Sequence, residues 1–257
     1  MNTIPVQKFP RDLGVMATPQ RVFLYSNLAG KYENRFHIGV STDGLSFKNH
    51  SKTPSLLDAN GISEEMRSAR DFRISSFGKN HVLLYKTLTG GPHLSAATSK
   101  DGVSWKKIGT IHSLHAMSML VPEYRHEGYY VAYTGEGDIR LAISKDLKEW
   151  QVTKEALVLP RNKYFDNFPI EVGTVMLTER GILLIYFVKE NKRENESYTV
   201  GAALFDKENP ARMLWRCEEP VWKQPEEWKT KVVYPMGALK FKEKLILYFG
   251  IERESVT

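Results

Sequence analysis

A short phrase recurs along the 257 residues: serine, any residue, aspartate, glycine or leucine, two more residues, then an aromatic residue. The three copies occupy residues 41–47, 99–105 and 144–150. Each copy separates two segments in which apolar residues alternate, which is the pattern of β-strands. Aspartate accepts hydrogen bonds from nearby backbone N–H groups and glycine adopts positive φ, so the phrase predicts a tight turn between two strands.

The spacing of these turns predicts the fold class. The aspartates Asp43, Asp101 and Asp146 are followed by a fourth, Asp206, at steps of roughly 45–60 residues, each of which has room for four short strands. That period indicates an all-β, five-bladed β-propeller. The predicted blades span residues 13–48, 72–109, 118–152, 171–217 and 233–250.

Residues 1–257 are interpreted as a single β-propeller domain, because no long proline- or serine-rich linker divides them. The fifth blade is short by about two strands. We expect it either to be incomplete or to be closed by the N-terminal segment, because an unpaired strand edge favours aggregation.

Composition excludes several function classes. The net charge of +6 is spread along the chain without a basic stripe, so no nucleic-acid partner is expected. The single cysteine, Cys217, excludes an intrachain disulfide and a multi-cysteine metal site, and no spaced histidine motif occurs, so no metal or cofactor is expected. No apolar run approaches about 18 residues, so we expect no membrane partner and a cytoplasmic location.

In a propeller the first strand of each blade lines the central channel, so polar residues there are candidates for a site. The candidates are Asp12, Asp71, Arg73, Ser118, Glu123, Asp166, Glu171 and Tyr234, with His115 just before a first strand. The turn aspartates Asp43, Asp101 and Asp146 lie on the outer rim of the predicted blades and are expected to be structural.

The last third of the chain carries a longer ordered pattern. Its segments are Val172-Gly173, Leu184-Ile185-Tyr186-Phe187, Gly201-Ala202-Ala203-Leu204, Asp206 followed by Asn209-Pro210, Tyr234-Pro235-Met236-Gly237, and Tyr248-Phe249-Gly250. In this order they resemble glycoside hydrolase family 130, the β-mannoside phosphorylases and mannosidases. Earlier in the chain, Asp71-Phe72-Arg73 resembles that family's Glu-Asp-Pro-Arg segment.

The resemblance implies a five-bladed propeller that cleaves a mannoside by single displacement with inversion, using an aspartate as proton donor. By position that donor is Asp71. Glu123, Asp166 and Glu171 are the candidates for activating water, and Arg73 for holding a sugar hydroxyl or phosphate. Asp12, His115, Ser118 and Tyr234 are the remaining candidates for contact with an oligosaccharide substrate.

In the phosphorylases of this family, inorganic phosphate replaces water and is held by basic residues. Phe187 stands where the resemblance implies a histidine, and Tyr133-Thr134 stand where it implies an arginine. A phosphate site needs charged donors, so the sequence favours a glycosidase that uses water, or a related glycosyl-transferring enzyme, over phosphorolysis. The alternative is a propeller without catalysis that binds glycans or a protein partner.

Overall fold

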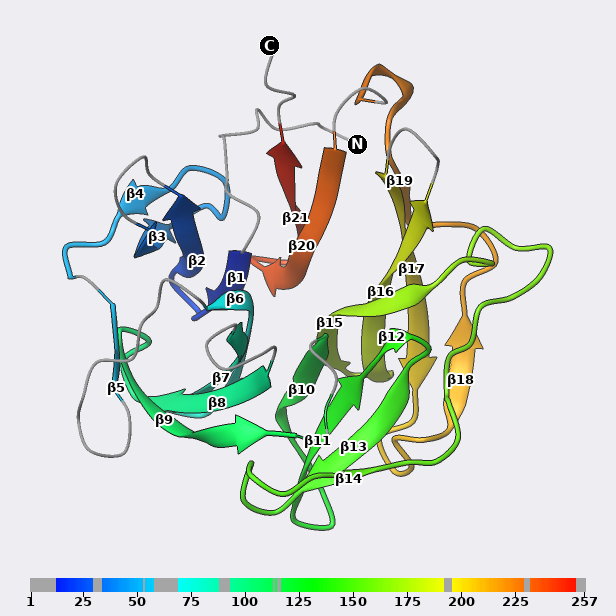
Figure 1. Cartoon of the computed structure of the whole chain (residues 1–257), viewed down its shortest axis with the longest axis horizontal. Helices are drawn as coiled ribbons and strands as arrows, with labels where there is room; N and C mark the ends of the chain where they lie inside the picture. The colour runs from blue at the N-terminus through cyan, green and yellow to red at the C-terminus, as the bar shows by residue number, and fades with distance from the viewer. Residues whose placement is uncertain are drawn as a thin grey trace.

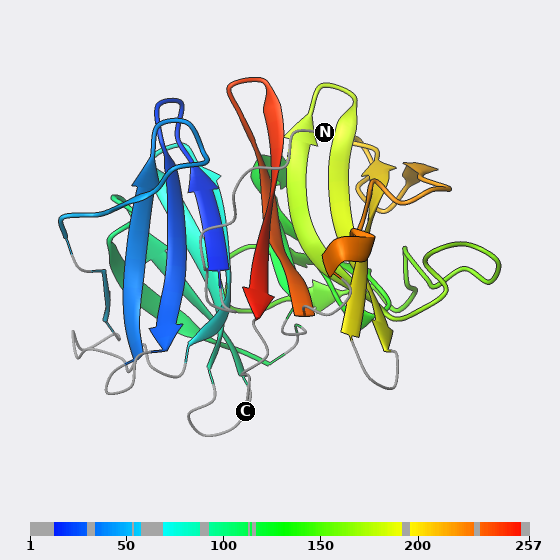
Figure 2. The ribbon, with the colours of Figure 1, turned by 90° about the horizontal axis from the view of Figure 1, so that it is seen from above.

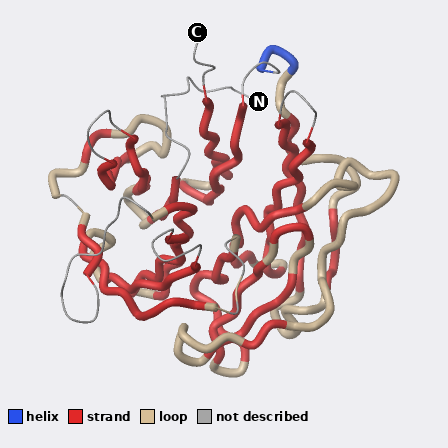
Figure 3. The backbone as a smooth tube through the Cα atoms, viewed as in Figure 1, coloured by secondary structure: helices blue, strands red, loops and turns tan. Residues whose placement is uncertain are grey.

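The computed structural model of the chain describes residues 13–29, 34–52, 54–57, 69–87, 93–112, 114, 117–191, 196–228 and 232–252. Strands dominate these residues, and their only helical segment is a short 3-10 turn at Glu226–Trp228 (Figure 3). Within the described ranges, no helix has the length and apolar character needed to span a membrane.

The first two sheets are meanders of antiparallel strands. The first contains β1 (Leu13–Ala17), β2 (Val22–Ala29), β3 (Asn34–Ser41) and β4 (Lys48–Asn49). The second contains β6 (Arg70–Phe77), β7 (Asn80–Thr87), β8 (His93–Ser99) and β9 (Ser104–Ile111), and β5 (Ser55–Leu57) adds to β9 in parallel.

The third sheet contains β10 (Ser118–His126), β11 (Tyr129–Thr134), β13 (Arg140–Ser144) and β14 (Gln151–Val152). The fourth contains β15 (Ile170–Thr178), β16 (Gly181–Asn191), β17 (Glu196–Phe205) and β18 (Met213–Arg216), with β12 (Glu136–Gly137) beside β15 and β19 (Trp222–Lys223) beside β17. The last sheet pairs β20 (Val232–Phe241) with β21 (Lys244–Glu252).

The five sheets surround a common centre, with β1, β6, β10, β15 and β20 as their innermost strands (Figure 1). Each innermost strand packs against the next, and β20 packs against β1, so the arrangement forms a closed ring. Seen from above, neighbouring sheets stand side by side with their strands running along the same general direction (Figure 2). The predicted all-β propeller is therefore confirmed.

The sheet in the fifth position is smaller than the other four. Four sheets have four or more strands, whereas the sheet in the fifth position has two among the described residues. A four-stranded meander needs three hairpin connections, and the described residues from Val232 onward form one, between β20 and β21. The N-terminal residues 1–12, one of the two expected ways of completing this sheet, lie outside the described residues.

The hydrophobic core lies between the sheets. One buried cluster separates the first and second sheets, and others separate each following pair, including the fifth and the first. The aromatic residues of the recurring phrase contribute to it, since Trp105 and Trp150 are both buried. This arrangement leaves polar side chains at the starts of the innermost strands free to meet around the centre of the ring.

The recurring phrase forms the turn that the sequence predicts. In the second blade, Asp101 accepts the backbone N–H groups of Val103 and Ser104, and Gly102 has φ of 70°. The indole of Trp105 donates to the Gly102 carbonyl at 3.2 Å. Asp43 and Asp146 accept equivalent backbone N–H groups in the first and third blades, which confirms a structural role for all three aspartates.

Candidate active site

Asp71 lies at a distorted point near the start of β6. The pairing of β6 with β7 shifts register between Arg70 and Arg73, which marks a β-bulge. Asp71 within it has φ of 53°, a conformation that costs a non-glycine residue free energy and that concentrates at functional sites. Its side chain is half-buried. The bulge therefore changes the direction of one acidic side chain at the start of an innermost strand.

Glu171 is the second acidic residue at this end of the ring. It is the second residue of β15, it is half-buried, and it pairs with Phe187 of β16. Burial raises the pKa of its carboxyl group above the ordinary value, and the carboxylate of Glu136 raises that pKa further. The charges of Lys189 and Arg73 lower the same pKa, and the charge of Asp71 raises it. Glu171 is thus electrostatically coupled to groups on β6, β12 and β16.

Arg73 occupies a buried position between two innermost strands. Its guanidinium donates to the Phe72 carbonyl at 3.2 Å and lies 3.8 Å from the sulfur of Met117, just before β10. Arg73 therefore brings a positive charge among the carboxyl groups. Of the residues proposed from sequence, Asp71 and Arg73 are near enough to Glu171 for their charges to act on its pKa.

Two residues of this cluster were missed by sequence reasoning. Glu136 belongs to the two-residue strand β12, and Lys189 lies near the end of β16. A two-residue strand has no alternation that a sequence pattern could reveal. Phe187 lies opposite Glu171, and Lys189 follows Phe187 by two residues, so both side chains are on the same face of β16. This two-residue spacing is the sequence signal that could have identified Lys189.

Glu123 lies elsewhere. Its carboxylate accepts the backbone N–H of Gly78 at 2.7 and 2.9 Å, and Gly78 is in the turn that follows β6. Asp71 is at the beginning of the same β6 strand, so Glu123 serves the opposite end of the ring. The sequence placed Glu123 on an innermost strand correctly, but its position along that strand keeps it away from Asp71 and Glu171.

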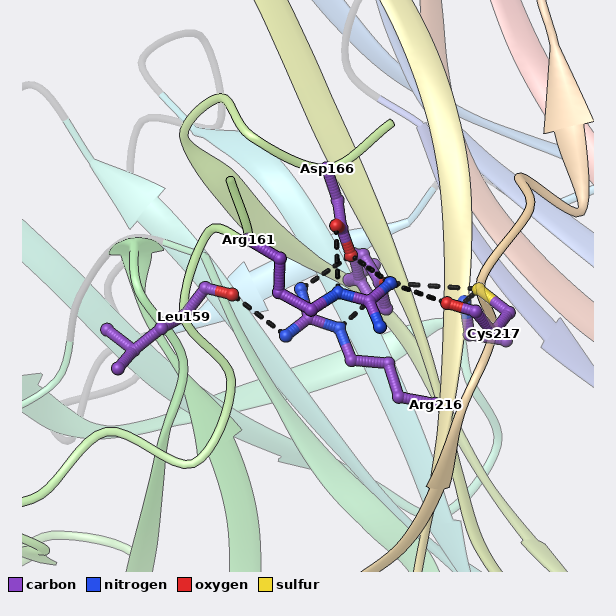
Figure 4. A network of polar contacts seen from close by, with 7 residues as sticks. Leu159, Arg161, Asp166, Arg216 and Cys217 are labelled. Atoms are coloured by element: carbon purple, nitrogen blue, oxygen red, sulfur yellow. Dashed lines mark hydrogen bonds and ion pairs between the residues drawn. The ribbon is translucent and has the colours of Figure 1, made fainter. Parts of the chain in front are cut away.

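Asp166 is fully buried inside a network of polar contacts (Figure 4). Arg161 donates to both of its carboxylate oxygens at 3.0 Å, Arg216 donates at 2.6 Å, and Tyr186 donates at 2.7 Å. Burial alone would raise its pKa, but these hydrogen bonds and charges hold the pKa of Asp166 below the ordinary value. A carboxylate with so many donors has no free face for water, so Asp166 stabilises the fold and does not activate water.

The network ties the segment before β15 to the outer strand of the fourth blade. Arg216, at the end of β18, also donates to the Leu159 carbonyl at 2.8 Å, and Arg161 donates to the carbonyl of Cys217 at 2.5 Å. Asp166 stands four residues before β15 begins at Ile170. The network therefore fixes the chain segment that leads into Glu171.

The remaining candidates are placed as follows. Ser118 is buried at the start of β10, where its hydroxyl group lies 2.6 Å from that of Thr134. Tyr234 belongs to β20, opposite Gly250, but its side chain lies outside the described residues. Asp12 and His115 also lie outside them. Among the described side chains, no group of three or more His, Cys, Asp or Glu residues could hold a metal ion.

The two positions with an expected phosphate ligand carry uncharged, buried residues. Phe187 is 2% exposed and packs in the cluster between the fourth and fifth sheets. Tyr133 donates its hydroxyl hydrogen to the Pro210 carbonyl at 2.7 Å, and Thr134 faces Ser118. None of these side chains supplies the positive charge of a phosphate clamp.

Comparison with known proteins identifies relatives across nearly the whole chain. A family model described as beta-1,4-mannooligosaccharide phosphorylase matches residues 11–256. A 1,2-beta-oligomannan phosphorylase of Thermoanaerobacter sp. (strain X514) is 26% identical over 232 residues, which cover 86% of this chain and 76% of that protein.

Solved structures show the same fold. A glycosyl hydrolase from Bacteroides ovatus matches with a TM-score of 0.74 and 23% identity, over 95% of this chain and 82% of that one. The beta-1,2-mannobiose phosphorylase from Listeria innocua, solved as a complex with beta-1,2-mannobiose, matches with a TM-score of 0.73 and 18% identity, over 97% of this chain and 89% of that one.

Proposed function

Because this chain belongs to glycoside hydrolase family 130, we propose that it cleaves β-mannosides by single displacement at the site that contains Asp71 and Glu171. One observation carries the proposal: Asp71 and Arg73 near the start of β6 and Glu171 at the start of β15 lie at the same end of the ring, and the charges of Asp71 and Arg73 act on the pKa of Glu171. An inverting glycosidase uses two carboxyl groups, one as the general acid and one as the general base.

The proposed step assigns one proton transfer to each carboxyl group. Glu171 takes a proton from a water molecule whose oxygen bonds to the anomeric carbon of the mannosyl unit. The bond from that carbon to the glycosidic oxygen breaks, and the departing oxygen receives the proton of Asp71. The raised pKa of Glu171 makes its carboxylate a stronger base than an ordinary glutamate.

Water is proposed as the nucleophile because of the residues at Phe187 and Tyr133. Both are buried and uncharged at positions where the family resemblance implies phosphate ligands. Arg73 and Lys189 both lower the pKa of Glu171, so we assign their positive charges to balancing the nearby carboxylates rather than to binding phosphate. Two of the named relatives are phosphorylases and a third is a glycosyl hydrolase, so the nucleophile is the part of the proposal that the next experiment tests directly.

The test is product analysis with and without inorganic phosphate. The purified chain is incubated with β-1,2- and β-1,4-linked mannobiose and with aryl β-mannosides, and free mannose and mannose 1-phosphate are separated by anion-exchange chromatography. Release of mannose at the same rate in both buffers supports hydrolysis. Formation of mannose 1-phosphate in the phosphate buffer would show that phosphate, and not water, is the nucleophile. Oligosaccharide binding by calorimetry without any product would favour the non-catalytic propeller.

A further inference from the structure

Glu136 approaches the site by an unusual path. It follows β11 of the third blade directly, yet the strand β12 that contains it pairs with β15 of the fourth blade. In that antiparallel pair Glu136 lies directly opposite Glu171, and Gly137 lies opposite Ile170. Side chains of directly opposed residues project on the same face of the sheet, so the two carboxyl groups share one face.

Glycines on both sides shape this crossing. Gly135 has φ of 153°, and a Cβ atom added there would lie 1.8 Å from the carbonyl oxygen of Asp138. Gly137 has φ of 102°. Its backbone conformation is one that residues with side chains rarely adopt. The N–H of Gly135 also donates to the Met117 carbonyl at 3.0 Å, which ties the crossing to the start of β10. The backbone therefore determines where Glu136 stands.

A glutamate at position 136 does not stabilise the fold. Like charges directly opposite each other in an antiparallel pair are destabilising, and Glu171 is also half-buried. A threonine or lysine opposite Glu171 would remove the repulsion. Glu136 itself is exposed, so burial does not require a carboxylate at this position.

We propose that Glu136 is a positioning residue of the proposed reaction, whose carboxylate faces Glu171 across β12 and β15 and strengthens Glu171 as the base that takes the proton from water. The inference rests on the proposed function. The charged groups that act on Glu171 are Glu136 from β12, Lys189 from β16, and Arg73 and Asp71 from β6. Of the groups that increase its basicity, Glu136 has the largest influence.

The sign of the effect is fixed by charge. Loss of the Glu136 charge makes the ionised form of Glu171 more favourable, so the pKa of Glu171 falls. The base then remains ionised at lower pH, but it is weaker. The acidic limb of the profile of kcat/KM against pH therefore moves to lower pH, and the plateau falls by no more than about tenfold because the base itself remains.

The test combines a titration with kinetics. The carboxyl carbon resonance of Glu171, assigned by its absence in Glu171→Gln, is followed by NMR from pH 3 to 9, values that span the ordinary carboxyl range. This is done in the wild type, Glu136→Gln, Glu136→Asp and Glu149→Gln. Glu149 is exposed on the outer turn of the third blade and is the matched control. Each variant is also assayed for kcat/KM against pH on the mannoside that the wild type cleaves.

The expected result is a Glu171 midpoint at lower pH in Glu136→Gln, a midpoint near the wild-type value in Glu136→Asp, and no change in Glu149→Gln. An unchanged midpoint in folded Glu136→Gln, or an equal shift in the control, would overturn the inference. If no mannoside is cleaved by the wild type, the proposed function fails, whereas the titration still decides whether Glu136 acts on Glu171.

Discussion

Tyr248 donates a hydrogen bond to the carbonyl oxygen of Gly44 across 2.9 Å, and this contact joins the last sheet to the outer turn of the first blade. The same relation occurs twice more. Tyr25 donates to Gly102 at 2.9 Å and Tyr133 donates to Pro210. In each case a tyrosine from the second strand of one sheet reaches the turn that precedes β4, β9 or β18 in the next sheet. The two-stranded fifth sheet therefore makes the inter-blade contact that complete blades make.

The first prediction concerns this contact. Tyr248→Phe removes the hydroxyl group and leaves the buried Gly44 carbonyl without its donor, which lowers the free energy of unfolding by about 1–3 kcal/mol. Urea denaturation followed by tryptophan fluorescence measures the change. Tyr164→Phe, at an exposed tyrosine, is the control and should leave the midpoint in place. Equal stability of the wild type and Tyr248→Phe would contradict the role of this hydrogen bond.

The second prediction separates the two ends of the ring. Asp71→Asn removes the proposed proton donor, so kcat/KM on an unactivated mannoside falls by about 10²–10⁴-fold. Glu123→Gln, whose side chain can still accept from Gly78, keeps wild-type kcat/KM because it lies at the other end. A full rate in Asp71→Asn would remove Asp71 from the mechanism, and a large loss in Glu123→Gln would show that the reaction occurs at the other opening.

The third prediction concerns the buried network of Figure 4. Asp166→Asn removes the negative charge that Arg161 and Arg216 share, and leaves two guanidinium groups without their counter-ion. The expected loss is about 3–5 kcal/mol of unfolding free energy. The pKa of Asp166 is lowered in the folded chain, so its contribution is present above the ordinary value of 3.8 and is lost as pH falls through the folded pKa.

This third prediction is checked by chemical denaturation of the wild type and Asp166→Asn at pH 7 and again in increasingly acidic buffers. The difference between the two proteins should shrink as the pH falls below 3.8, because Asp166 then takes up a proton in the unfolded chain while it is still ionised in the folded one. A difference that stays constant down to the lowest pH would show that the loss arises from packing rather than from charge.

The fourth prediction has the opposite sign. The pKa of Glu171 is raised in the folded chain, so its contribution to stability is complete below the ordinary value of 4.5 and is lost as pH rises through the folded pKa. Glu171→Gln cannot ionise and escapes that loss. The variant should therefore gain stability relative to the wild type as the pH rises above 4.5, while its activity falls. Parallel stability profiles for the two proteins would contradict the raised pKa.

The sequence predicted the strands well because their signals are local. Alternation within a strand and the side-chain hydrogen bonds of a turn such as Asp101 act over a few residues, and the predicted boundaries of the second blade differ from those of β6–β9 by at most two residues. The grouping of Asp71, Arg73 and Glu171 was also predictable, because the starts of innermost strands meet around the centre of a propeller.

The errors arose where distant segments decide the environment. Asp166 looked like a free acid, but Arg216, one of its partners, follows it by 50 residues and reaches it from β18. Glu136 was invisible because its strand belongs to the sheet of a different blade from the strands on either side of it. Neither relation leaves a periodic signal in the sequence, since each depends on how complete sheets are packed.

The hairpin of β20 and β21 supplies one wall of two separate apolar interfaces. Phe241 and Met236 pack toward the first sheet, while Leu247 and Phe249 pack toward the fourth. Ending the chain before Val232 would therefore expose the apolar faces of the first and the fourth sheet together. Unfolding of this hairpin would therefore expose apolar surface on both adjacent sheets at once.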